Sequence, residues 1–98
     1  MEGMMKSLKE IYADLREIRY YYSKREVFEN GPVQSSLREK VERYNQAMRD
    51  APARLYDLYI SLYIQNNSQA ALSFDWDFSP DYIKQLNRLL CEYLQKNL

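Results

Sequence analysis

Apolar residues recur every three or four positions along most of this chain, which is the period of a helix that buries one face. The first stripe predicts a helix over about residues 4–28, inside an N-terminal segment of residues 1–30. Its members are Leu8, Ile11, Tyr12, Leu15, Ile18 and Tyr22. A break follows at Asn30, Gly31 and Pro32, because glycine takes the left-handed conformation that stops a helix and proline cannot continue one.

Two further helices are predicted in the middle of the chain, over residues 35–49 and 52–65. Ser36 and Glu39 have the spacing of a capping box at the start of the first helix. The apolar stripe of this helix is Leu37, Val41, Tyr44 and Met48. The second helix is apolar on almost all sides, so we expect it in the middle of a bundle. Isoleucine and tyrosine also suit a strand, but the sequence offers no second strand for pairing.

The last third of the chain has the spacing of a helix-turn-helix. The sequence predicts a short helix over residues 68–74, a tight turn at Asp77 and Phe78, and a final helix over residues 79–96. Both helices open with a serine, whose hydroxyl can accept from an unsatisfied backbone N–H, and a proline suits the first position of the final helix. The side chains expected to face the core are Leu72, Trp76, Ile83, Leu86, Leu90 and Tyr93.

These elements together predict an all-α protein, a compact bundle of about five helices that ends in a helix-turn-helix and forms a single domain over residues 1–98. Ninety-eight residues suffice for one hydrophobic core, and 46% apolar residues argue against disorder. No run of about 18 apolar residues occurs, so we expect no membrane span. We expect a cytoplasmic location, because the N-terminus lacks the apolar stretch of a signal peptide. The single cysteine, Cys91, lies in an apolar helix and is expected to be inert packing.

An enzyme is not expected from these residue types. Histidine is absent, one cysteine cannot form a thiolate metal site, and the only glycines are Gly3 and Gly31. The one acidic cluster, Asp75, Asp77 and Asp81, is better explained by capping and turn formation than by acid–base catalysis or metal binding. We therefore expect no cofactor and no metal.

The charge of the chain argues against strong independent binding to nucleic acid. The chain has 14 basic and 14 acidic side chains, so its formal charge is zero. Proteins that bind nucleic acid usually carry a basic excess. Residues 68–98, which contain the helix-turn-helix, have three basic side chains against four acidic ones.

The exposed side of the final helix nevertheless carries groups suited to DNA. Arg88 can bond guanine with two hydrogen bonds, Gln85 can bond adenine, and Lys84 can attract phosphate. The alternative is an ordinary solvated helix face, which often contains the same residue types. The predicted DNA-binding set is Ser79, Asp81, Tyr82, Lys84, Gln85 and Arg88.

Residues 55–94 resemble region 4 of bacterial sigma factors. The resemblance consists of an apolar helix followed, without a gap, by Ser68, Leu72, Ser73, Trp76, Asp77, Ser79 and Ile83. More closely, the chain resembles small sigma-like proteins of phages and prophages of Gram-positive bacteria. These are the autolysin-regulator and late-gene activator type and a streptococcal phage family of unknown function. The similar stretches are Leu15–Phe28, Tyr44–Pro52 and Leu55–Leu94.

This resemblance implies a phage transcription regulator whose residues 52–98 form the helix-turn-helix unit. It implies double-stranded DNA as a partner, and RNA polymerase as a further one. The chain departs from the family pattern at three positions: Ser73 replaces alanine, Asp77 replaces glycine, and Asp81 puts a negative charge near phosphates.

The competing hypothesis is a helical protein–protein interaction module, an adaptor or polymerase-associated factor without independent DNA binding. The neutral charge and the aromatic run Tyr20–Tyr22 favour it. Two roles are compatible with the apolar stripe of the helix predicted over residues 4–28: packing within the monomer, or forming a homodimer.

Overall fold

The computed structural model describes residues 6–24 and 35–98, and all regular secondary structure in these residues is helical. The elements are α1 (Leu8–Ser23), α3 (Ser35–Met48), α4 (Ala53–Tyr59), the π-helical turn η1 (Ile60–Ile64), α5 (Gln69–Trp76) and α6 (Pro80–Asn97). The predicted all-α bundle ending in a helix-turn-helix is confirmed.

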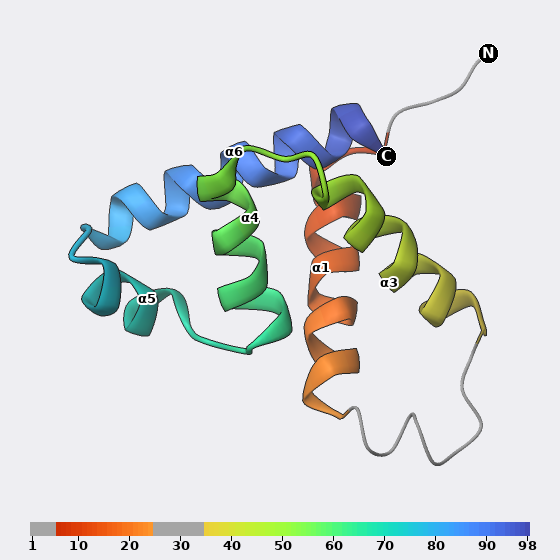
Figure 1. Ribbon diagram of the computed structural model, residues 1–98, viewed down its shortest axis with the longest axis horizontal. Helices are drawn as coiled ribbons and strands as arrows, with labels where there is room; N and C mark the ends of the chain where they lie inside the picture. Colours follow the sequence, from red (N-terminus) through yellow and green to blue (C-terminus); the bar gives the residue numbers. More distant parts are fainter. Residues whose placement is uncertain (1–5, 25–34) are drawn as a thin grey trace.

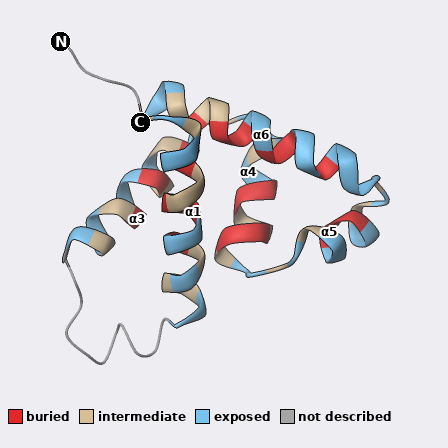
Figure 2. Cartoon of the chain, turned by 180° about the vertical axis from the view of Figure 1, so that it is seen from behind, coloured by how far each residue is buried: buried red, intermediate tan, exposed pale blue. Residues whose placement is uncertain are grey.

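The long helix α6 crosses the other elements, as Figure 1 shows, and packs against α1, α3, α4 and α5. Helix α1 stands in the centre, between α3 and η1. The C-terminal end of α6 lies beside the start of α1, where the Gln95 Nε2 donates to the Lys6 carbonyl at 2.8 Å. Each of these elements contributes buried residues to a single core, and the buried positions are coloured red in Figure 2.

Helix α1 is shorter than predicted, because Ser7 caps it. The Ser7 Oγ accepts from the Glu10 N–H at 3.1 Å, and the Glu10 Oε1 accepts from the Ser7 N–H at 2.9 Å. This capping box fixes the start at Leu8, so the predicted start near residue 4 is wrong. The helix ends at Ser23 rather than near residue 28, since Lys24 leaves the helical conformation. The predicted break at residues 30–32 lies outside the described residues.

The apolar stripe of α1 is used inside the chain. Ile11, Leu15 and Ile18 are buried in the common core, against η1, α3 and α6. Of the two uses open to this stripe, packing within the monomer is the one found, and the buried stripe offers no surface to a second copy of the chain. A homodimer through another part of α1 stays a prediction.

Helix α3 begins one residue earlier than the predicted cap. Ser36 lies inside the helix, which starts at Ser35, so Ser36 is not the N-cap that the capping-box spacing suggested. The stripe of α3 is otherwise as expected, with Val41, Tyr44 and Met48 buried. The predicted range of residues 35–49 is therefore confirmed to within one residue, and only the assignment of Ser36 as the N-cap is wrong.

A buried carboxylate joins α1 to α3. Asp14 is only 6% exposed and accepts from the Lys6 Nζ at 2.8 Å and from the Tyr44 hydroxyl at 2.6 Å, while the Lys40 Nζ lies 3.0 Å away. Burial raises the pKa of Asp14, but the hydrogen bonds from Lys6, Tyr44 and Lys40 outweigh it and hold this pKa below its usual value. The charge of Asp14 is thus fully compensated inside the bundle.

The third predicted helix is not one regular α-helix. Helix α4 passes directly into η1, where the Gln65 N–H bonds the Ile60 carbonyl five residues back at 2.8 Å. Asn66 follows in the left-handed conformation with φ 63°, beyond the last helical turn. The expectation of a helix buried on nearly all sides is wrong, because Tyr56 is 42% exposed.

Two smaller expectations concern the membrane and the cysteine. None of the helices in residues 6–24 and 35–98 is long and apolar enough to cross a membrane. Cys91 is buried, and burial raises the pKa of its thiol to about 12. At neutral pH it is therefore the packed, unreactive thiol expected from the sequence.

Candidate DNA-binding site

The turn between α5 and α6 has the predicted geometry. Asp77 ends α5 in the left-handed conformation, with φ 57° and ψ 41°. The Phe78 N–H then bonds the Ser73 carbonyl at 3.1 Å, a helix ending of the Schellman type. Helix α5 itself starts at Gln69, after Ser68, whose hydroxyl accepts from the Ala71 N–H at 3.0 Å.

Ser73 adds a side-chain bond across this turn. It is buried, and its hydroxyl donates to the Phe78 carbonyl. The Ser73 hydroxyl thus supplies a second link between the end of α5 and the chain leading to α6.

Helix α6 begins as predicted. The Ser79 hydroxyl accepts from the Tyr82 N–H at 3.2 Å, and Pro80 occupies the first helical position. The predicted core residues Ile83, Leu86 and Leu90 are all buried. Tyr93 is half-buried, and its hydroxyl donates to the Ala47 carbonyl of α3 at 3.3 Å.

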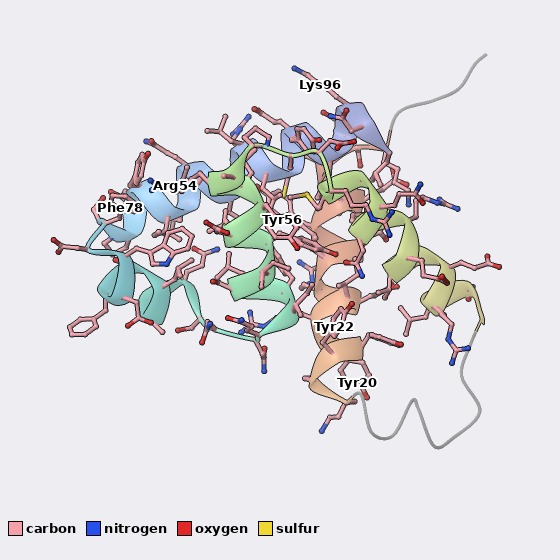
Figure 3. All side chains as sticks on the ribbon, viewed as in Figure 1. Tyr20, Tyr22, Arg54, Tyr56, Phe78 and Lys96 are labelled. Atoms are coloured by element: carbon pink, nitrogen blue, oxygen red, sulfur yellow. The ribbon has the colours of Figure 1, made fainter. Side chains whose placement is uncertain are left out.

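An aromatic cluster braces the turn against α4. The Phe78 ring lies edge-on to Tyr82, with centroids 4.8 Å apart, and edge-on to Trp76 at 6.4 Å. The Arg54 guanidinium stacks over Phe78 at 5.0 Å and over Trp76 at 5.8 Å, as Figure 3 indicates for Arg54 and Phe78. Trp76, expected to face inward, is therefore half-buried in this cluster. The role of Arg54 is not predictable from local spacing, because the rings it contacts lie more than twenty residues away in the sequence.

The predicted DNA-binding residues divide into two groups. Lys84, Gln85, Arg88 and Asp81 are exposed along the outer side of α6. Ser79 and Tyr82 have structural partners, since the Ser79 hydroxyl caps the helix and the Tyr82 ring stacks on Phe78. Ser79 and Tyr82 are exposed as well, but these contacts assign them to positioning α6, whereas Lys84, Gln85, Arg88 and Asp81 are the side chains that a ligand could engage.

The outer side of α6 has mixed charge. The Arg88 Nε lies 3.3 Å from the Glu92 Oε2, one helical turn along, and Asp75, Asp77 and Asp81 are exposed nearby. An exposed pair of this kind is worth under about 1 kcal/mol, so a phosphate can displace Glu92 from Arg88. Among the described residues, no group of three or more cysteine or acidic side chains is placed to hold a metal ion.

Comparison of the chain with protein-family models, with curated proteins and with solved structures finds no match. The geometry of the site is therefore the main basis for the function proposed below.

Proposed function

We propose that this chain is a DNA-binding transcription regulator, of the phage or prophage kind that the resemblance to sigma region 4 implies. The observation that carries the proposal is the turn at Asp77, whose left-handed geometry and flanking caps are those of a helix-turn-helix. In proteins with this motif the second helix lies in the major groove, with its N-terminal residues at the base edges. Here that helix is α6.

The exposed residues of α6 have distinct proposed roles. Gln85 contacts a base edge, while Lys84 and Arg88 contact phosphates or a guanine at the groove edge. Asp81 lies in the first turn, near the phosphates, and opposes binding. The balance of charges supports modest affinity in isolation and stronger binding with a second protein, for which the resemblance implies RNA polymerase.

The test is DNA binding by fluorescence anisotropy across a salt series, with phage promoter duplexes. The Lys84→Ala/Arg88→Ala variant should bind at least about tenfold more weakly, and its salt slope should fall by roughly 1.8, since each phosphate contact contributes about 0.9. Lys96→Ala is the matched control, because Lys96 lies at the far end of α6 from the turn (Figure 3). No binding at low salt, alone or with polymerase, would overturn the proposal.

A second candidate function rests on Phe74, which is 87% exposed on α5. The neighbouring Ala70 and Ala71 are exposed as well, so α5 presents a small apolar face to solvent. Exposed apolar patches often mark protein-binding surfaces, which favours a protein–protein interaction module. In a transcription reporter, this candidate predicts that Phe74→Ala abolishes regulation and that Lys84→Ala/Arg88→Ala leaves it intact. The DNA-binding proposal predicts loss of regulation in the Lys84→Ala/Arg88→Ala variant.

A further inference from the structure

The charges of α1 are separated around its circumference. Its acidic residues Glu10, Asp14 and Glu17 follow the i, i+4, i+7 spacing of one helix flank. Its basic residues follow a second flank, at i, i+7 and i+10. These are Lys9, Arg16 and Arg19. Helix α1 thus carries three acidic residues on one side and three basic residues on another.

Lysine side chains pair with two of the three residues of the acidic flank, Asp14 and Glu17. The Lys40 Nζ of α3 lies 3.0 Å from the Asp14 Oδ1 and 2.8 Å from the Glu17 Oε1, and Lys6 also bonds Asp14. The basic flank has no such compensation. Lys9 and Arg16 are exposed, and neither is ion-paired with any residue that the structure describes.

The basic flank of α1 borders α6. Tyr12, at the spacing of this flank, is half-buried against α6; its burial and the neighbouring Cys91 thiol raise its pKa, and the charge of Arg88 partly opposes this shift. Farther along α1, the Arg19 Nε donates to the Asn66 Oδ1 at 2.5 Å. These contacts fix the basic flank on the side of the bundle where α1 meets α6 and the segment after η1.

The basic residues of the proposed DNA-binding helix lie on the matching edge. Lys84, Arg88, Cys91 and Gln95 share the i, i+4, i+7, i+11 spacing of one edge of α6. Gln95 bonds the Lys6 carbonyl, and Cys91 lies against Tyr12, so the C-terminal part of this edge faces α1, while Lys84 and Arg88 are exposed. Lys84 and Arg88 therefore lie on the same edge of α6 as Cys91 and Gln95, toward the N-terminal end of the helix from these two contacts.

We propose that Lys9 and Arg16 of α1 hold the DNA backbone beside the groove that α6 enters. This inference rests on the proposed function and supplies the positive charge that the helix-turn-helix segment lacks. Lys9 and Arg16 are seven positions apart in α1, about 10 Å along the helix axis, so the two side chains reach different phosphates of a strand. Double-stranded DNA fits this face, because its regularly spaced negative charge matches cations spread over two helices.

The test compares Lys9→Ala/Arg16→Ala with Arg38→Ala/Arg43→Ala, a control that removes the same charge from exposed positions of α3. In the anisotropy salt series, the α1 variant should bind about tenfold more weakly, with the salt slope reduced by roughly 1.8. Its preference among duplex sequences should stay unchanged, since phosphate contacts do not read bases. Circular dichroism checks folding, and Lys9→Gln/Arg16→Gln provides a second, longer neutral pair.

The outcomes separate this inference from the proposed function. If the unmodified chain binds duplex DNA, and Lys84→Ala/Arg88→Ala weakens binding while the α1 variant behaves like the α3 control, the inference is overturned and the proposed function stands. Equal weakening by the α1 and α3 pairs also overturns it, because binding then depends only on total charge. Absence of binding by the unmodified chain, with or without polymerase, removes the proposed function itself.

Discussion

The contact between α1 and α3 depends on polar groups far apart in sequence, whereas the hydrogen bonds that cap α5 and α6 and close the turn between them join groups within a few residues of one another. Asp14 and Tyr44 are 30 residues apart, and their hydrogen bond is buried. In the α5–α6 unit, Ser68 and Ser79 each bond an N–H three residues ahead, and Ser73 bonds Phe78 five residues ahead. The α1–α3 contact thus forms only when the tertiary fold forms, whereas these hydrogen bonds of α5, α6 and their turn join residues that are close in sequence.

A segment whose shape is determined by local hydrogen bonds is not for that reason a stable part of the fold. The helix-turn-helix takes its shape from local caps, but α5 buries little, since Leu72 and Ser73 are its only buried side chains. Regions with few buried apolar contacts open before the rest of a protein. We therefore expect α5 and the turn that follows it to be locally well specified and less stable than the rest of the bundle.

The largest expected effect on stability is that of Leu72→Ala. Leu72 is the sole apolar side chain of α5 in the core, and removing a buried leucine costs about 3 kcal/mol. Hydrogen exchange should show the loss first in α5 and the turn, with α1 and α3 still protected. Phe74→Ala is the matched control and should be nearly neutral, because Phe74 is exposed. Equal loss of protection in all helices would show that α5 is not a separate weak region.

The α1–α3 region is tested by Asp14→Asn, with an expected cost of about 2 kcal/mol in urea denaturation. The amide cannot compensate Lys6 and Lys40, and it accepts the Tyr44 hydroxyl bond more weakly. Glu17→Gln is the control, since Glu17 is exposed and its pair with Lys40 is worth under about 1 kcal/mol.

The same pair of variants predicts a pH dependence. The folded-state pKa of Asp14 is lower than its unfolded value, so its carboxylate stabilises the fold fully above the unfolded pKa of about 3.9. This stabilisation is lost as the pH falls through the folded pKa. The difference between the unmodified chain and Asp14→Asn should therefore shrink below about pH 4. A difference that stays constant down to pH 2 would contradict this assignment.

What the sequence could and could not predict follows the same division. Ser68, Asp77 and Ser79 act on backbone groups a few residues away, so their spacing predicted both caps and the turn. Asp14 gave no such signal, because its partners Lys40 and Tyr44 become neighbours only when α1 and α3 pack.

Arg54 and Ser36 were not predicted correctly, for two different physical reasons. The cation–π contact of Arg54 joins α4 to the turn, across a distance in sequence that periodicity does not address. Ser36 was misread as a cap because a capping-box spacing also occurs by chance inside helices. For the candidate site, the spacing along α6 predicted the exposed Lys84 and Arg88, but the basic flank of α1 required knowing that these helices cross.

A smaller effect is expected when Ser79, the N-cap of α6, is compared with Ser36, which was predicted to be an N-cap but lies inside α3. Ser79→Ala removes the side-chain acceptor for the Tyr82 N–H and should cost about 1 kcal/mol. Ser36→Ala should cost nothing, because Ser36 lies inside α3, where alanine is the better helix former. Thermal unfolding of both variants measures the contrast, and a larger loss from Ser36→Ala would restore the original capping prediction.

The smallest expected effect concerns Asp77, which holds the left-handed conformation at the turn. Glycine takes this conformation without the steric cost that a Cβ brings, so Asp77→Gly should stabilise the fold by about 0.5 kcal/mol. Asp77→Ala should destabilise it instead, because alanine keeps the Cβ and lacks the short polar side chain that helps aspartate here. Asp77→Gly also removes a negative charge beside α6, and Asp75→Ala removes a neighbouring one without touching the turn. If both variants raise DNA affinity equally, charge limits binding; if only Asp77→Gly does, the geometry of the turn limits it.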